Sequence, residues 1–281
     1  MASDATPLAI GGTLLLAGAG NMGRALLEGW LRQGLSPAAV IVQDPEPPPA
    51  TQALLVSNRI EVREHVSALA QTPAVIVVAV KPQVMDAVFP RLARLAGPQT
   101  VVLSVAAGRR IEGFERHLPA GRAVVRSIPN TPAAVGRGIT VAVANPHVSA
   151  AQRAICDRLL RAVGEVAWVV DEDLIDAVTA VSGSGPAYVF YLTECLAEAA
   201  VAAGLDAALA EKLARATVAG AGELLFRSPE SAAALRRKVT SPKGTTDAAL
   251  QVLMRTGEGG LARLLVEAVA AARRRSRDLA S

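Results

Sequence analysis

The feature that most constrains the fold is a glycine-rich segment near the N-terminus, LLLAGAGNMGR at residues 14–24. An apolar run breaks into Gly18, Gly20 and Gly23 and continues with helical apolar spacing over residues 22–31. In such a turn the first glycine permits the reversal, the second admits a pyrophosphate, and the third lets the helix pack on the strand. The anion would meet the unpaired N–H groups of the helix. The segment predicts a dinucleotide site, although a purely structural bend would carry the same pattern.

Apolar runs at regular intervals predict a sheet over residues 1–170. Several of them are continuous, which is typical of parallel strands buried on both faces. Strands that alternate with helices in this way predict an α/β fold with a doubly wound, mainly parallel sheet. The expected strands are residues 13–17, 40–43, 60–62, 74–80, 100–105, 123–127, 139–144 and 166–170.

From residue 171 to residue 281 the apolar spacing becomes helical. We expect helices at residues 174–181, 187–203, 206–226, 246–255 and 260–277. Residues 187–203 are so apolar that little of that helix can face water. This half of the chain is therefore expected to bury surface against another subunit as well as within itself.

Composition narrows the class of protein. The 281 residues are 51% hydrophobic and only 3% aromatic, with a net charge of +4, so no basic stripe with stacking aromatics points to nucleic acid. The arginines of residues 273–277 are read as a solvated helix end. Cys156 and Cys195 form no CxxC motif, the N-terminus has no basic secretory region, and the charge-free run 177–193 is cut by a Ser-Gly-Ser-Gly-Pro segment. We expect a soluble cytoplasmic protein without a membrane span.

Metal and nucleophilic catalysis find no support in the sequence. His65, His117 and His147 lack metal-ligand spacing, so no metal is expected. Ser184 lies between Gly183 and Gly185 but follows a predicted helix, whereas a hydrolase elbow follows a strand. Hydride chemistry with a bound coenzyme remains.

Asp44 bears on which coenzyme is used. It ends the second expected strand, 44 − 23 = 21 residues after Gly23, where a dinucleotide fold places a carboxylate on the adenosine ribose. That carboxylate would repel a 2′-phosphate, and residues 45–52 (PEPPPATQ) supply no cation. In the alternative, Asp44 only begins the turn before Pro45.

Three blocks together resemble one family, the Δ1-pyrroline-5-carboxylate reductases. The first is GAGNMG at residues 18–23, and the second combines AVKP at 79–82 with PNTP at 129–132. The third runs from DLIDAV at 173–178 through SGSGPAY at 182–188 to VTSPKGTT at 239–246. The resemblance covers nearly the whole chain.

The resemblance implies a Rossmann-type domain at residues 1–170 and an all-helical domain at residues 171–281 that interlocks with a second subunit. It implies reduction of a cyclic imine to L-proline with NADPH or NADH. The residues expected at the coenzyme, with Asp44 and Asn130 included, are Gly18, Ala19, Gly20, Asn21, Met22, Gly23, Asp44, Ala79, Val80, Lys81, Pro82, Ala106, Ala107, Gly108 and Asn130. Those expected at the substrate are Glu172, Ser241, Gly244, Thr245 and Thr246.

The expected chemistry needs little acid catalysis, because a protonated C=N group already accepts hydride readily. Backbone N–H groups of residues 243–246, at a helix start, are suited to the substrate carboxylate. We expect the Thr246 hydroxyl to bind the ring nitrogen as the catalytic side chain, mainly by positioning it. A purely capping role for residues 245–247 is the structural alternative.

Two departures from the family pattern leave details open. Lys243 replaces the first glycine of the usual Ser-Pro-Gly-Gly loop, and Arg236-Arg237-Lys238 stands where Lys, Asp and a neutral residue are common. The added charge would either tighten anion binding or point outward. It would also attract a phosphorylated coenzyme, against the inference from Asp44. A reductase of the six-membered imine and a non-catalytic dinucleotide-binding oligomer therefore stay open as alternatives.

Overall fold

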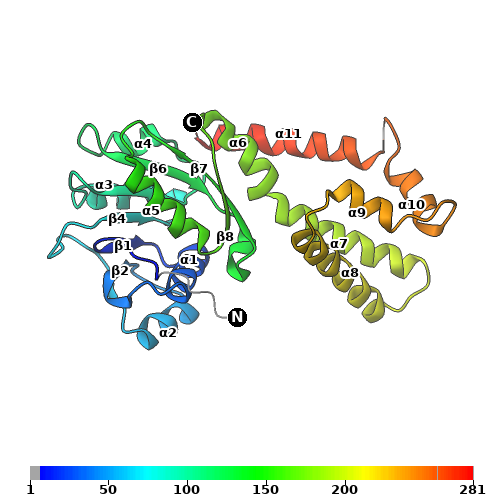
Figure 1. Ribbon diagram of the computed structural model, residues 1–281, viewed down its shortest axis with the longest axis horizontal. Coiled ribbons are helices and arrows are strands. Elements are labelled where there is room, and N and C mark those ends of the chain that lie inside the picture. The colour runs from blue at the N-terminus through cyan, green and yellow to red at the C-terminus, as the bar shows by residue number, and fades with distance from the viewer. Residues whose placement is uncertain (1–6, 258, 281) are drawn as a thin grey trace. The chain divides into compact units, whose positions relative to one another are not determined.

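The computed structural model describes residues 7–257 and 259–280 (Figure 1). The chain forms two compact units, an α/β unit of Met1–Gly183 with Arg273–Ser281, and a helical unit of Ser184–Ala272. The expected division after residue 170 stays a prediction. The expectation for the N-terminal segment falls partly on residues 1–6, which lie outside the described residues.

The α/β unit is built on an eight-stranded sheet in the order β3-β2-β1-β4-β5-β6-β7-β8. Every neighbouring pair is parallel except β6 and β7, which confirms the mainly parallel α/β prediction. The strands are β1 (Leu14–Ala17), β2 (Val40–Gln43), β3 (Glu61–Arg63), β4 (Val75–Val78), β5 (Val101–Ser104), β6 (Ala123–Ile128), β7 (Gly138–Ala144) and β8 (Gly164–Trp168).

Connection length explains the one antiparallel pair. A parallel crossover needs a dozen or more residues, but only residues 129–137, including the 3₁₀ turn η3 (Thr131–Val135), join β6 to β7. Apart from residues 64–74 between β3 and β4, the other connections carry helices or 3₁₀ turns, which allows parallel pairing. They are α1 (Asn21–Arg32), η1 (Pro37–Ala39), α2 (Pro49–Ser57), η2 (Pro82–Val84), α3 (Met85–Ala93), α4 (Ile111–Glu115) and α5 (Ala150–Arg161).

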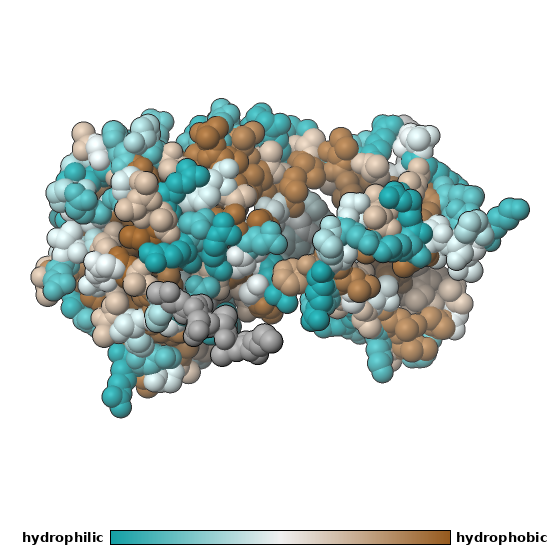
Figure 2. Space-filling model, in the orientation of Figure 1, coloured by the Kyte–Doolittle hydropathy of each residue, from teal (hydrophilic) through white to brown (hydrophobic). Residues whose placement is uncertain are grey.

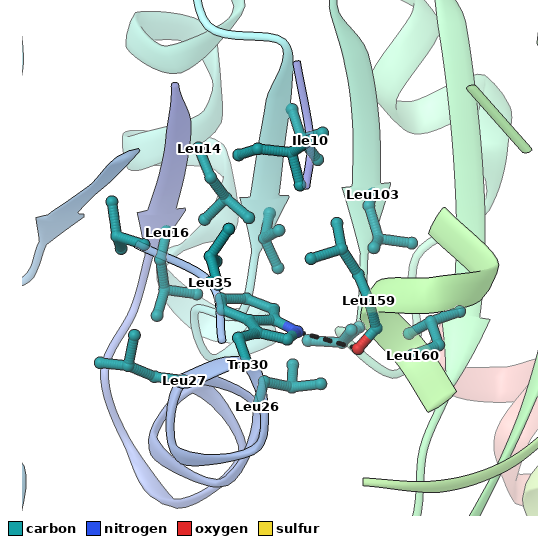
Figure 3. Close-up of a cluster of buried hydrophobic side chains, with 14 of the residues drawn as sticks. Ile10, Leu14, Leu16, Leu26, Leu27, Trp30, Leu35, Leu103, Leu159 and Leu160 are labelled. Carbon is teal, nitrogen blue, oxygen red and sulfur yellow. Dashed lines mark hydrogen bonds between the residues drawn. The ribbon is translucent and has the colours of Figure 1, made fainter. Parts of the chain in front are cut away.

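Trp30 of α1 anchors the hydrophobic core on one face of the sheet. Its ring is fully buried, and its indole N–H donates to the Leu159 carbonyl of α5 at 2.8 Å (Figure 3). Gly29 permits this close approach, since a Cβ there would lie 2.7 Å from the Ala162 carbonyl oxygen. A second cluster that includes Phe89 and Phe114, whose rings meet edge to face at 4.9 Å, fills the other face. The closely packed clusters on the two faces of the sheet therefore hold β1, and with it the start of the glycine turn, in a rigid position.

After β8 the chain is helical, as predicted, but two details differ. The single helix expected at 174–181 is instead a 3₁₀ turn η4 (Glu172–Leu174), α6 (Ile175–Val178) and a π-helical turn η5 (Thr179–Gly183). The helices α7 (Gly185–Ala202), α8 (Ala207–Arg227), α10 (Thr245–Leu253) and α11 (Leu261–Ala280) match expected ones. The short helix α9 (Ala232–Lys238) was not predicted; its N-cap Ser231 accepts from the Ala234 N–H. In residues 7–257 and 259–280, no helix has the length and apolar character needed to cross a bilayer.

Candidate functional site

The glycine turn after β1 has three differently constrained glycines. Gly18 has a φ of +93°, and a Cβ there would lie 2.6 Å from the Ala79 carbonyl oxygen. A Cβ on Gly23 would lie 2.1 Å from the Gly18 carbonyl oxygen. At Gly20, in contrast, a Cβ would meet nothing within 4 Å. Gly18 and Gly23 thus serve internal packing, and Gly20 presents bare backbone to open space.

Helix α1 starts beside that open space. Its N-cap is Gly20, no side chain caps its first turn, and that turn contains no acid. The first N–H groups of a helix have no partner within the helix, and the helix dipole favours an anion there. The structure therefore fits the diphosphate of a dinucleotide on two grounds, namely bare backbone at Gly20 and uncapped N–H groups at Asn21 and Met22.

Asp44 lies directly against the glycine turn. Its Oδ2 accepts a 2.7 Å hydrogen bond from the Ala19 N–H, and its Oδ1 accepts one of 2.9 Å from the Glu46 N–H. The buried Thr51 hydroxyl donates to the Ala19 carbonyl at 2.9 Å. Asp44 thus takes part in the turn before Pro45 and also fixes the glycine loop, so the two sequence readings are compatible.

The ends of β4 and β5 add small residues beside the turn. Both strands lie on the same side of β1 and run parallel to it, so their carboxyl ends share one edge of the sheet. The Ala79 N–H donates to the Ala17 carbonyl at 2.7 Å, and Gly108 adopts a φ of +72°. The side chain of Lys81 is exposed, and Ala106 is buried. The predicted segment 79–82 therefore starts against the glycine turn, and 106–108 follows β5 at the same edge of the sheet, where open α/β sheets bind ligands.

Asn130 is occupied with internal contacts. Its amide oxygen accepts from the Ile139 N–H at 2.9 Å, and its amide nitrogen donates to the Ser182 carbonyl at 3.2 Å. The side chain thus joins β7 to the π-helical turn η5. Its contact with the coenzyme stays a prediction.

Glu172 is held by a buried arginine that the sequence analysis missed. Its Oε1 accepts from the Ile111 N–H at 2.9 Å and from Arg126 Nη1 at 2.7 Å. The Arg126 side chain is only 2% exposed, and its Nε has no hydrogen-bond partner among the described residues. A charged residue within the apolar strand AVVRSI was the available signal. Because a buried arginine requires a counter-ion, Arg126 and Glu172 are best read as a pair.

The same corner of the α/β unit carries a second ion pair. Arg110 Nη2 donates to Asp173 Oδ1 at 2.7 Å. This hydrogen bond lowers the pKa of the Asp173 carboxyl below its ordinary value and raises the pKa of the Arg110 guanidinium. Glu172 thus lies close to two cationic side chains, those of Arg126 and Arg110.

The predicted substrate loop, residues 241–246, belongs to the helical unit and runs from the segment after α9 into the first residues of α10. Lys243 has a φ of +59°, a left-handed conformation that disfavours residues with a Cβ, and its N–H donates to Asp247 Oδ2 at 3.1 Å. The N-cap of α10 is Gly244, with no side-chain cap. The N-cap position is therefore Gly244 rather than a threonine, and Thr245 and Thr246 are the first two helical residues; their contact with the substrate stays a prediction.

In residues 7–257 and 259–280, no three His, Cys, Asp or Glu side chains gather in a way that could hold a metal ion. The polar groups described above are hydrogen-bond donors, carboxylates and hydroxyls. The donors among them can bind the anionic groups of an organic ligand, and the carboxylates can bind its hydroxyl or N–H groups.

Comparisons with known proteins match both units. The family model described as pyrroline-5-carboxylate reductase dimerisation matches residues 172–279, and the one described as NADP oxidoreductase coenzyme F420-dependent matches residues 13–108. The chain is similar to a pyrroline-5-carboxylate reductase from Pseudomonas aeruginosa, with 40% identity over 94% of this chain and 95% of that protein. A second such enzyme, from Synechocystis, is also 40% identical, over 94% of this chain and 97% of its own length.

Solved structures agree with these matches. A pyrroline-5-carboxylate reductase from Coxiella burnetii aligns with a TM-score of 0.87 and 33% identity, covering 96% of this chain and 99% of its own. The pyrroline carboxylate reductase of Plasmodium falciparum, solved with NADP bound, aligns with a TM-score of 0.79 and 26% identity, covering 96% of this chain and 99% of its own.

Proposed function

The chain belongs to the pyrroline-5-carboxylate reductase family, and from this premise we infer that it reduces 1-pyrroline-5-carboxylate to L-proline, the last step of proline biosynthesis. The observation that carries the inference is the 40% identity to a reductase of that name over 94% of the chain. A Rossmann-type unit with an open cradle at Gly20 agrees with an oxidoreductase that uses a nicotinamide coenzyme.

When bound, the reduced nicotinamide supplies a hydride to the carbon of the protonated C=N bond. The protein's part is to bind and to orient. Residues 18–23 hold the diphosphate on the N-terminus of α1, and the small residues of 79–82 and 106–108 leave room along the strand ends. The Plasmodium falciparum enzyme solved with NADP supports NADPH as one coenzyme of this fold. Residues 13–108 carry nearly all of the predicted coenzyme contacts.

For the substrate, we assign the carboxylate to backbone N–H groups at the start of α10. The Lys243 and Gly244 N–H groups are already bound, to Asp247 Oδ2 and to the Ser241 carbonyl, so the assignment rests on the N–H groups of Thr245 and Thr246, the first two residues of the helix. The Thr246 hydroxyl lies in that turn and is placed to orient the ring nitrogen by a hydrogen bond. Glu172 and Ser241 complete the proposed set. With the imine already protonated, these groups contribute positioning more than acid catalysis.

The enzyme works as a self-associating protein, which the dimerisation match supports. None of the residues of α7 is buried within the single chain, and Phe190 and Tyr191 are 62% and 68% exposed. Figure 2 shows hydrophobic residues at the surface of the helical unit. Apolar patches of this kind are typical of protein interfaces. We propose a dimer, or a higher oligomer built from dimers, that covers α7.

We place the enzyme in the cytoplasm. Its two cysteines, Cys156 and Cys195, are both free thiols, as expected in a reducing compartment. We propose no nucleic-acid or membrane partner, because the sequence has no aromatic-lined basic stripe.

The decisive assay follows NADH or NADPH oxidation by the purified protein with 1-pyrroline-5-carboxylate, with no imine, and with the six-membered imine. We expect imine-dependent oxidation and a higher kcat/KM for the five-membered ring. Faster turnover of the six-membered imine would reassign the substrate. Coenzyme binding without any turnover would make the protein a non-catalytic oligomer.

The role of Thr246 is tested by a pair of variants. Thr246→Ala should lower kcat with unchanged coenzyme affinity, and Thr246→Ser, which keeps the hydroxyl, should recover most of the rate. An equal loss in both variants, or a parallel loss of coenzyme affinity, would show that the hydroxyl does not orient the substrate.

A further inference from the structure

The surroundings of Asp44 distinguish between the two nicotinamide coenzymes. We propose that this enzyme prefers NADH over NADPH, because Asp44 is fixed at the ribose end of the cradle and the segment that follows it, residues 45–58, contains no Lys or Arg and offers few backbone donors to a 2′-phosphate. The proposal rests on the proposed function and names the coenzyme of the same site.

Asp44 is placed by the sheet. Gln43 pairs with Ala17 across β1 and β2, and the Gly18 N–H donates to the Gln43 carbonyl at 2.9 Å. Asp44, the residue that follows β2, therefore lies beside the start of the glycine turn. An acid at the end of this second strand is the group that binds ribose hydroxyls in dinucleotide folds.

Its carboxylate has little freedom to turn away from a ligand. One oxygen accepts from the Ala19 N–H at 2.7 Å and the other from the Glu46 N–H at 2.9 Å. A carboxylate has about four lone-pair sites, so each oxygen keeps one for a ribose hydroxyl. A 2′-phosphate would carry nearly two negative charges against this fixed anion. The exposed side chain of Glu46 adds a second carboxylate to the same turn.

The segment after Asp44 lacks the donors that a phosphate needs. Residues 45–58 contain no Lys or Arg. Pro45, Pro47, Pro48 and Pro49 have no N–H group, so they leave only Glu46 and Ala50 as backbone donors in residues 45–50. The Glu46 N–H is already bound to Asp44. The segment that leads into α2 therefore offers few hydrogen-bond donors to an anion.

Two arginines on the elements next to Asp44, Arg63 and Arg24, have partners of their own. On β3, Arg63 Nε donates to Glu61 Oε1 at 2.6 Å and Arg63 Nη1 to the Ala68 carbonyl at 3.0 Å. On α1, Arg24 lies 3.6 Å from the Glu28 carboxylate. A phosphate at Asp44 would have to break one of these pairs to gain a counter-ion.

The basic turn Arg236–Lys238, which the sequence offered as an attractor for phosphate, belongs to the helical unit. Its Lys238 Nζ lies 2.5 Å from Glu230 Oε1. Lys238 therefore already has a counter-ion within its own unit.

Calorimetry of NAD⁺ and NADP⁺ binding to the full-length protein tests the proposal without turnover. We expect NAD⁺ to bind at least about tenfold more tightly at low ionic strength, with the ratio falling as salt screens the repulsion. Steady-state kcat/KM values for NADH and NADPH with 1-pyrroline-5-carboxylate should show the same order. Equal or tighter NADP⁺ binding by the wild-type protein would overturn the proposal.

The Asp44→Asn variant keeps the shape and one acceptor for the Ala19 N–H but removes the charge. It should shift the NAD⁺/NADP⁺ affinity ratio toward NADP⁺ by about tenfold or more. The matched control Glu64→Gln removes an exposed carboxylate outside the turn and should leave the ratio within about twofold. An unchanged ratio in a folded Asp44→Asn protein would overturn the proposal, and if that variant does not fold, the wild-type ratio decides. Absence of imine-dependent turnover would refute the proposed function alone.

Discussion

Substituting alanine for Gly20 and for Gly23 should separate coenzyme binding from folding. A Cβ on Gly20 meets nothing within 4 Å, and its backbone angles, φ −65° and ψ −167°, suit alanine. A Cβ on Gly23 would lie 2.1 Å from the Gly18 carbonyl oxygen and 3.1 Å from its carbon. The first change therefore alters only the surface that a diphosphate approaches, while the second forces α1 away from the turn.

The expected magnitudes follow from these contacts. At Gly23, overpacking costs about 1–3 kcal/mol, and the better helix propensity of alanine returns up to about 1 kcal/mol. A net loss of roughly 1–2 kcal/mol in the free energy of unfolding is expected. At Gly20, replacing an N-cap glycine by alanine should cost about 0.5–1 kcal/mol. The added methyl group should nevertheless weaken coenzyme binding by about tenfold or more, since the anion can no longer reach the bare backbone.

Urea unfolding followed by tryptophan fluorescence, at one protein concentration for all variants, measures the first effect, and calorimetric titration with coenzyme measures the second. Wild-type coenzyme affinity in Gly20→Ala would refute the placement of the diphosphate at this turn. Wild-type stability in Gly23→Ala would show that the helix moves without cost and that the turn is not rigid.

Three further outcomes are expected. Lys243→Gly should raise the urea midpoint, by roughly 0.5–1 kcal/mol in stability, because relief of the strain of a lysine at φ +59°, about 1–2 kcal/mol, exceeds the roughly 0.5–1 kcal/mol of extra entropy that glycine loses on folding. Lys243→Ala should give no gain, and a gain in alanine would contradict the backbone argument. Trp30→Phe should cost about 2–4 kcal/mol, since it leaves the Leu159 carbonyl unpaired and opens a cavity, and near-neutral unfolding would disprove that the bond matters. Burial raises the pKa of the Cys156 thiol from its ordinary 9.0 to about 12. The contribution of the buried neutral thiol to stability is therefore complete below pH 9 and is lost as pH rises toward 12. The native thiol should resist alkylation at about pH 8, and rapid labelling would contradict its burial.

Much of the α/β unit was predictable because its signals are local. Apolar runs located the eight strands within about two residues, most directly at β1 and β4, since strands buried on both faces need no polar side chains. The glycine spacing located the turn and α1 for a similar reason, because only glycine fits where Gly18 and Gly23 pack against backbone. The three sequence blocks that resemble the reductase family then indicated the activity, which the spacing of apolar residues does not reveal.

Other features depended on groups far apart in the chain, and only the tertiary structure decided them. Arg126 and Glu172 are 46 residues apart, so neither could be recognised as the partner of the other from local pattern. Helix α9 was missed because a short alanine-rich run has a weak apolar period of its own.

Asp44 illustrates the division most clearly. The sequence alone determined that an acid follows β2 and that no Lys or Arg follows it within residues 45–58. The tertiary structure decided that the Ala19 and Glu46 N–H groups hold both of its oxygens and that the neighbouring arginines are paired elsewhere. Spacing along a chain can place a charge near a ligand, but the orientation of that charge and the neutralisation of its neighbours depend on contacts that folding alone creates.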